Sequence, residues 1–262
     1  MGPNNEFMEV FLNDIELSIL LPAFIAGLLV LATHIPFGMK VLERGVIFAD
    51  LAVAQIAGLG VIIAGLLDLT GKPLLVQAIA AASALCGAGL LAWIENRLAG
   101  VKEACIGLTF VLAASGGILL MSHDVHAGEH LKDLLVGQIL WVSNSQLIAT
   151  AFLTAALLAL WQWSRLKNHY LGFYALFALA VTASVQLVGV YLVFASLIVP
   201  ALATWRAGHR RMPYAFAIGI AGYAAGLLLS AWLDLPSGAT VVWAMAVTGV
   251  VAAWLLNMRK IS

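Results

Sequence analysis

Residues 171–205 read LGFYALFALAVTASVQLVGVYLVFASLIVPALATW, a run of 35 residues without a charged side chain. A helix needs about 20 apolar residues to cross a bilayer, so this run is too long for a single crossing. Gly189 lies near its middle and Pro200 follows later, and both residue types interrupt helices. The stretch therefore predicts two closely connected spans, at residues 172–188 and 189–205.

The rest of the chain continues this pattern. Of its 262 residues, 63% are hydrophobic and 10% are charged, with a mean hydropathy of +1.03, whereas soluble domains carry about 25% charged residues. A water-soluble fold is excluded, and we predict an all-α, polytopic transmembrane helical bundle of about nine spans. The seven further spans are expected at residues 17–34, 46–67, 74–93, 104–121, 146–163, 213–233 and 238–258.

The chain reads as one unit rather than several domains. Residues 1–7 look like a cloning remnant, with Met8 as a plausible native start, and residues 8–262 form a single transmembrane domain. The first apolar run lacks the basic region and cleavage site of a secretory signal, so we expect it to be retained as a span.

Basic residues predict the orientation of the spans. Lys and Arg are retained on the cytoplasmic side of membranes, and here 11 of the 13 fall on one side when the nine spans are threaded in order. This places the N-terminus outside and the C-terminus in the cytoplasm, in a multi-pass protein of the cytoplasmic membrane. The 11 are Lys40, Arg44, Arg97, Lys102, Arg165, Lys167, Arg206, Arg210, Arg211, Arg259 and Lys260, against Lys72 and Lys132 outside.

Nine carboxylates fall on the outer side under the same threading. A negative outer face concentrates cations, although acids also collect wherever basic residues are excluded, and the sequence leaves both readings open. They are Glu6, Glu9, Asp14, Glu16, Asp68, Asp124, Glu129, Asp133 and Asp234.

The second span carries the clearest polar residues within the membrane. Asp50 lies about one turn inside it, and Gln55 follows five residues later. Ionisable groups are costly in a bilayer, so such residues are candidates for a transport path. Asp50 is a candidate hard oxygen ligand for a divalent cation and Gln55 a carbonyl ligand. Five residues at about 100° each separate the two side chains by about 140°. The alternative is a structural role, in which Asp50 pins a neighbouring helix.

A histidine-rich segment lies on the expected outer side. Residues 122–133 read SHDVHAGEHLKD and contain three of the six histidines. Imidazole and carboxylate together suit zinc and similar ions, and His126 and His130 share a face if the segment is helical. With Glu129 they form a candidate site for metal capture. A solvated polar loop is the alternative, because no closed four-ligand spacing is present.

Several function classes find no support in the sequence. No Gly-x4-Gly-Lys-Ser/Thr loop occurs, so this chain is not expected to bind ATP in that way, and no hydrolytic signature appears in the spans. The basic residues are scattered in pairs at helix ends, which argues against nucleic-acid binding. Cys86 and Cys105 read as packing residues rather than as a disulfide or metal pair. We therefore predict that the chain is not an enzyme.

Three regions together resemble the permease subunits of ABC importers for zinc, manganese and related divalent cations. Residues 41–60, VLERGVIFADLAVAQIAGLG, are similar to the first cytoplasmic loop and second span of that family. Residues 103–107, EACIG, resemble its acidic-x-x-Ile-Gly motif. Residues 186–203 and 234–240 are similar to its late Val-Gly-Val…Pro-Ala and Leu-Pro-Ser-Gly-Ala signatures.

This resemblance implies a permease domain over residues 8–262 and a set of partners. They are a second copy of the chain in a homodimer, cytoplasmic ATPase subunits that carry the ATP, and an external metal-binding protein. The transported divalent metal, zinc first and manganese or iron next, is cargo, and no covalent cofactor is expected. The motifs place Glu103 and Pro200 in coupling or gating.

The chain departs from the family pattern at two places. The family usually carries Asp-Ala-x-x-His in the second span, whereas here Leu51 and Gln55 align with the aspartate and histidine and Asp50 stands one place earlier. The ligand set is altered, so ion identity does not transfer. Residues 164–170 are also much shorter than the family's ATPase-contacting connection. An accessory metal-sensing subunit and a carrier independent of ATP therefore stay as alternatives to an importer permease.

Overall fold

The computed structural model describes residues 17–69, 71–122, 135, 137–163 and 169–258. Over these ranges the chain is helical and contains no strand. The α-helices are α2 (Leu17–Arg44), α3 (Ala49–Leu66), α4 (Pro73–Arg97), α5 (Lys102–Leu120), α7 (Asn144–Trp163), α8 (Tyr170–Val188), α9 (Val190–Ala203), α10 (Arg211–Leu233) and α11 (Ser237–Met258); η1 (Ile139–Trp141) and η3 (Gly208–Arg210) are short 3-10 turns.

The predicted all-α bundle is confirmed. Eight helices in the described ranges are long and apolar enough to cross a membrane, and α9 is a shorter apolar helix of 14 residues. Each of the nine predicted spans falls on one apolar helix, but α9, predicted as a span at residues 189–205, is shorter than the eight helices that could cross a membrane.

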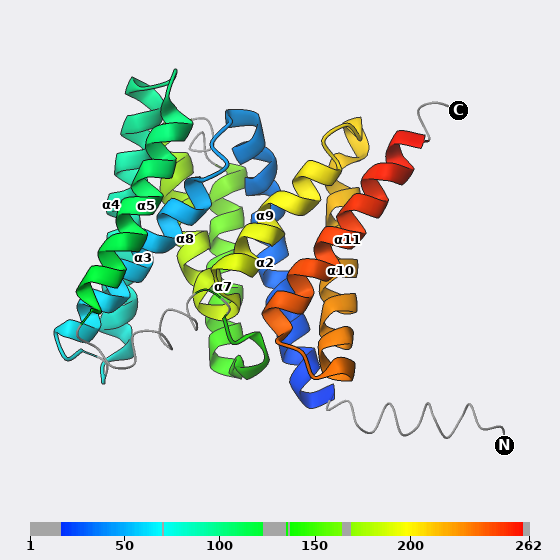
Figure 1. Ribbon diagram of the computed structural model, residues 1–262, viewed down its shortest axis with the longest axis horizontal. Coiled ribbons are helices and arrows are strands. Elements are labelled where there is room, and N and C mark those ends of the chain that lie inside the picture. The colour runs from blue at the N-terminus through cyan, green and yellow to red at the C-terminus, as the bar shows by residue number, and fades with distance from the viewer. Residues whose placement is uncertain (1–16, 70, 123–134, 136, 164–168, 259–262) are drawn as a thin grey trace.

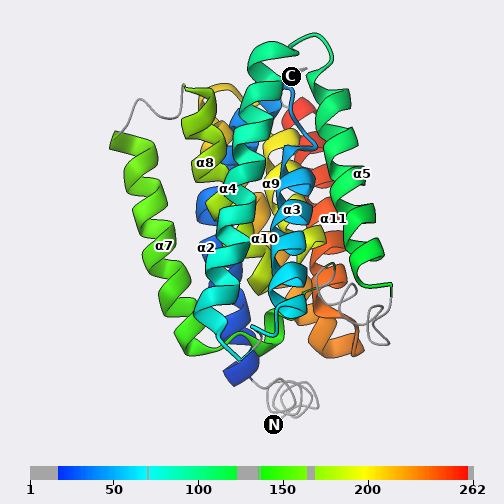
Figure 2. The ribbon, with the colours of Figure 1, turned by 90° about the vertical axis from the view of Figure 1, so that its left-hand side faces the viewer.

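The bundle is arranged around α2, α8 and α9 (Figures 1 and 2). Helices α3, α4 and α5 pack together on one side and α10 and α11 on the other, while α7 lies against α2 and α8. Helix α8 is the most buried span, because α4 and α3 cover one side of it and α2 and α7 another. The core is formed mainly by α2, α8 and α9.

The long apolar run is divided at Gly189, as predicted. Gly189 has φ +81, a backbone conformation that side chains rarely adopt, and it separates α8 from α9. Its N–H donates to the Val185 carbonyl at 2.9 Å, and its own carbonyl accepts from Val193 at 3.1 Å. These two bonds pair one carbonyl in the last turn of α8 and one N–H in the first turn of α9.

The first span extends further than the sequence indicated. It was expected to end at residue 34, but α2 continues to Arg44 with Pro36 inside it. Proline is tolerated in membrane helices because neighbouring helices compensate for the lost backbone bond. Close packing supports the extension, since a Cβ built on Gly38 would lie 2.0 Å from the Leu197 carbonyl oxygen of α9. Only residues 45–48 connect α2 to α3.

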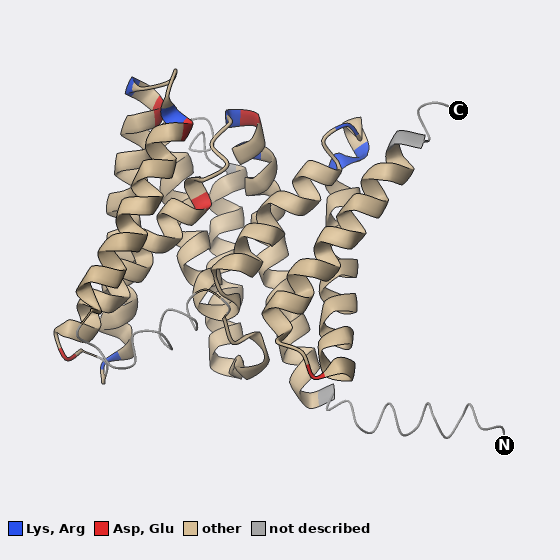
Figure 3. Ribbon diagram, in the orientation of Figure 1, with Lys and Arg blue, Asp and Glu red and all other residues tan. Residues whose placement is uncertain are grey.

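Basic residues gather at one end of the bundle (Figure 3). Seven of the eight Lys and Arg residues in the described ranges lie at the helix ends and turns of that face, and Lys72 lies at the opposite one. This distribution agrees with the predicted topology, which places these basic residues on one side of the membrane and Lys72 on the other. That the basic end faces the cytoplasm stays a prediction. The seven are Lys40, Arg44, Arg97, Lys102, Arg206, Arg210 and Arg211.

Candidate functional site

Asp50 is the second residue of α3, and its side chain is fully buried. Val53 and Ala57 share its face of the helix and are buried with it. Gly60, which lies against Ser83 of α4, is only about 20° from Val53 around the helix, so this side of α3 also meets α4. Helix α3 contacts α5, α8 and α9 as well.

Neither carboxylate oxygen of Asp50 has a hydrogen-bond partner among the described residues. A buried polar group without a partner is costly, and a buried charge more so. The structural alternative, in which Asp50 pins a neighbouring helix, would place a donor beside it, and none is found there. A bound cation would supply the missing interaction. Asp50 is thus the strongest candidate ligand in the membrane part of the chain.

Gln55 lies on a different face of α3. It is half-buried, as is Leu51 one turn before it. Both belong to the face that continues to Leu59 and Ile62, which approach Gly117 of α5. The structure therefore does not bring Gln55 and Asp50 together, as the predicted separation of about 140° requires. Within the described ranges no three His, Cys, Asp or Glu side chains form a group.

A charged cluster fixes the end of α2 that leads into α3. Arg44 donates from Nη1 to Oε2 of Glu95 at 3.0 Å, and Lys102 lies 4.0 Å from Oε1 of the same carboxylate. Lys102 also donates to the Arg44 carbonyl. The Arg44 guanidinium lies 4.3 Å from the Phe173 ring centre. We call Arg44, Glu95 and Lys102 the ion cluster; it joins α2, α4 and α5.

Glu103 lies beside the ion cluster and contacts the start of α3 directly. Its Oε1 accepts the backbone N–H of Phe48 at 3.1 Å, and its Oε2 has no partner among the described residues. Phe48 precedes α3 and has no side-chain cap. Glu103 therefore helps to position the turn of helix that carries Asp50. This contact gives the predicted coupling or gating role a physical basis without testing it.

Pro200 lies inside α9 and is buried. It has no N–H, so the Ser196 carbonyl, four residues earlier, loses its usual intrahelical donor. The Ser196 hydroxyl lies 3.0 Å from the Tyr223 hydroxyl of α10 and donates to the Leu192 carbonyl at 2.7 Å. Ser196 therefore bridges α9 and α10 in this arrangement.

The predicted capture residues His126, Glu129 and His130 lie outside the described residues. The described chain resumes fully at Gly137, whose backbone packs on the turn between α8 and α9. A Cβ at Gly137 would lie 2.3 Å from the Val188 carbonyl carbon. The side chains of Gln77 and Gln186 hydrogen bond between α4 and α8 near the same end.

Sequence reasoning missed Glu95 as an organising residue. It stands close to Arg97 at the end of an apolar run and reads as an ordinary helix terminus. Its partners lie 51 residues earlier and seven residues later in the chain. Its burial, with 6% exposure, was the one property that could have marked it, and no local pattern reports burial at a helix end.

Three comparisons place the chain among known proteins. A model described as the ABC 3 transport family matches residues 16–169 and 164–256. A probable iron transport system membrane protein of Haemophilus influenzae is 27% identical over 180 residues, which cover 60% of this chain and 66% of the relative, slightly less than two thirds of its length.

The solved structure of PsaBC from Streptococcus pneumoniae in complex with Fab contains a similar chain. The two superimpose with a TM-score of 0.70 at 21% identity, covering 94% of this chain and 95% of that one. At this identity the likeness shows the fold alone. The family match covers more than half of the sequence and agrees with the helical bundle described above, so the chain belongs to the ABC 3 transport family.

Proposed function

We propose that this chain is the permease subunit of an ABC-type importer that carries a divalent transition-metal ion across the cytoplasmic membrane. The family is a transport family, and one relative is named as part of an iron transport system. The observation that carries the proposal is Asp50, a fully buried carboxyl group on a membrane helix whose two oxygens have no partner among the described residues.

Asp50 would act as an oxygen ligand for the ion in transit. A metal ion would offset the cost of burying this carboxylate, which the neighbouring side chains do not offset. Because Asp50 is fully buried in this arrangement, the ion enters and leaves through other arrangements of the helices, as alternating access requires. Water, backbone carbonyls or a second copy of the chain would complete the coordination shell.

Gln55 would act separately from Asp50. It lies on the half-buried face of α3 that continues toward α5, so it would contact an ion before or after Asp50 rather than with it. His126, Glu129 and His130 would capture the ion on the outer side. Replacing both histidines by Ala is expected to weaken uptake mainly at low metal concentration. An unchanged concentration dependence would remove the capture step.

The proposed assembly contains two copies of this chain, cytoplasmic ATPase subunits and an external metal-binding protein. ATP would bind only to the ATPase subunits. The ion cluster and Glu103 lie at the basic end, where the ATPase would dock, and they tie α2, α4 and α5 to the start of α3. Movement of that end would thus reach Asp50 through one turn of helix.

Reconstitution tests the proposed function. The chain is placed in proteoliposomes with and without a candidate cytoplasmic ATPase subunit from the same organism, and inward uptake of zinc, manganese and ferrous iron is measured at equal free concentrations. We expect uptake that requires ATP and the ATPase. Uptake without ATP would indicate a gradient-driven carrier, and binding without uptake would indicate an accessory subunit. The ranking of the three ions tests the prediction of zinc.

A further inference from the structure

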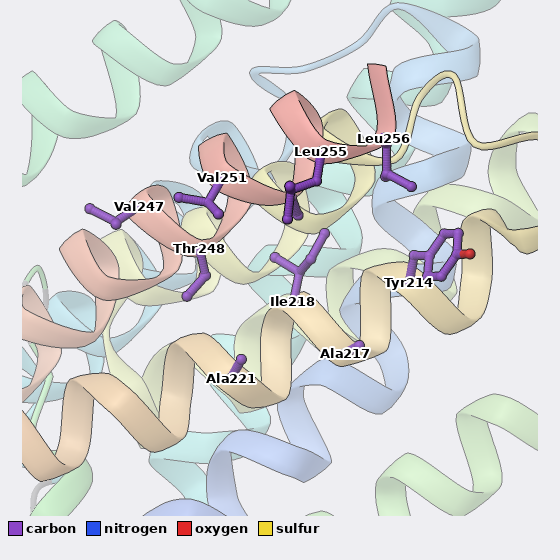
Figure 4. A pocket seen from close by; sticks show the side chains of 10 residues that line it. Tyr214, Ala217, Ile218, Ala221, Val247, Thr248, Val251, Leu255 and Leu256 are labelled. Carbon is purple, nitrogen blue, oxygen red and sulfur yellow. The ribbon is translucent and has the colours of Figure 1, made fainter. Parts of the chain in front are cut away.

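An apolar groove lies between α10 and α11 in the half of the bundle nearest the basic end. Its volume is about 420 Å³. Tyr214, Ala217, Ile218 and Ala221 of α10 form one wall, and α11 from Val247 to Leu256 forms the other (Figure 4). At 1.5 Å per residue the walls run for roughly 10 to 14 Å along the helices. That is close to the thickness of one leaflet's hydrocarbon layer, about 15 Å.

The two helices approach each other very closely at their other end. A Cβ at Gly226 would lie 2.4 Å from Val241, and one at Gly222 would lie 2.8 Å from Met245. Beyond Gly222, toward the basic end, Gly219 faces Leu31 of α2, and Ala217 and Ala221 line the groove. Both alanines are exposed, and their short side chains leave the space beside α11 unfilled. The groove therefore results from the sequence, which places small residues where the two helices separate.

The mouth of the groove carries an excess of positive charge. Lys40 and Arg211 both form ion pairs with Glu43, at 3.4 and 3.3 Å. Among the described residues, no other carboxylate forms an ion pair with either cation. The Arg211 guanidinium also lies 4.9 Å from the Trp205 ring centre.

Arg210 is the residue best placed to meet a ligand in the groove. It ends the turn η3, immediately precedes α10 and stands four residues before Tyr214, which lines the groove. Arg210 is exposed, and no ion pair or hydrogen bond of its side chain is found with the described residues. An exposed cation therefore lies at the end of α10 that borders the groove.

We propose that this groove binds an anionic phospholipid of the leaflet on the basic side, with one acyl chain between α10 and α11 and the phosphate at Arg210. Basic pockets between membrane helices on the cytoplasmic side are suited to anionic head groups. A second copy of the chain fits less well, because a symmetric pairing through this face would bring two basic corners together. The proposal does not depend on which ion is transported.

Native mass spectrometry of the purified full-length chain tests the lipid site. Phosphatidylglycerol and phosphatidylcholine with identical acyl chains are titrated, and bound lipid is counted. We expect wild type to prefer phosphatidylglycerol. Arg210→Gln should weaken phosphatidylglycerol binding about fivefold and leave phosphatidylcholine unchanged, whereas Ala221→Phe, which fills the groove, should weaken both. Ala217→Phe serves as a second groove variant if Ala221→Phe does not fold.

Two matched controls define the outcome. Arg97→Gln removes an exposed cation at the same end, and Val250→Phe enlarges an exposed side chain of α11 that does not line the groove. Both should bind lipid as wild type does. Unchanged phosphatidylglycerol binding in Arg210→Gln, or equal losses in the controls, would overturn the proposal. A groove variant that shifts the monomer–dimer distribution while lipid binding is unchanged would assign the groove to a second copy instead.

Discussion

Phe48 donates its backbone N–H to Oε1 of Glu103 across 3.1 Å, and Asp50 follows two residues later. Phe48 immediately precedes α3 and Glu103 lies in the first turn of α5, so one hydrogen bond connects the basic end of α5 to the turn of helix that carries the buried carboxylate. A displacement of α5 at that end would be transmitted to Asp50 over a short, rigid distance.

Glu103→Ala removes this hydrogen bond, and we expect uptake in proteoliposomes to fall about fivefold, with a loss of about 1 kcal/mol in the free energy of unfolding. Glu103→Gln keeps an acceptor oxygen and should restore most of the rate. Glu43→Ala, which breaks two partly exposed ion pairs, is the control. Wild-type uptake by Glu103→Ala at equal amounts of folded protein would show that this contact does not position α3.

Glu95→Ala should destabilise the bundle strongly. Glu95 and Arg44 are 6% and 11% exposed, and removing one partner of a buried ion pair costs about 3 kcal/mol. Glu43→Ala should cost no more than about 1 kcal/mol, as exposed pairs do. Unfolding in lipid micelles measures both. Similar losses of unfolding free energy in the two variants would show that the ion cluster stabilises the bundle no more than the exposed ion pairs of Glu43 do.

Gly137→Ala tests the contact between the segment before α7 and the turn at Gly189. Gly137 has φ +71, and a Cβ there would lie 2.3 Å from Val188. Left-handed strain and overpacking together should cost about 3 kcal/mol. Gly208→Ala has a similar φ, +59, but open space around it, so it should lose only about 1 kcal/mol. Equal thermal shifts for the two variants would contradict the observed close approach.

Much of the fold could be predicted because every span must be an apolar helix long enough to cross the bilayer. Apolar length and the placement of Lys and Arg predicted nine helices and the break at Gly189, where glycine alone takes φ +81 readily. The end of α2 was wrong by ten residues. Pro36 and Lys40 suggest a helix end locally, but packing of Gly38 on Leu197 overrides that preference.

The candidate site was predictable only in part. Asp50 stands out in any reading of the sequence because it is a charged residue in an apolar run. Its lack of a partner, and the burial of Glu95, depend on residues many turns away in the chain. Partner choice at such distances is set by how helices pack, which periodicity does not report. The resemblance to metal permeases added the predicted coupling or gating role of Glu103, and the structure added its contact with Phe48.

Asp50→Asn should abolish metal uptake while the variant folds and assembles as wild type does. The amide keeps the size of the side chain but removes the negative charge that would hold the ion. Asp68→Asn is the matched control, because Asp68 is exposed near the far end of the same helix and has φ +56, which asparagine tolerates well. Wild-type uptake by Asp50→Asn would return Asp50 to a structural role.

An anomalous difference map of crystals grown with the transported metal and measured at its absorption edge tests the central claim most directly. We predict a peak within about 2.6 Å of an Asp50 carboxylate oxygen, absent from Asp50→Asn and unchanged in Asp68→Asn. A map with no metal at this position, in which a protein donor satisfies the Asp50 carboxylate, would contradict the account.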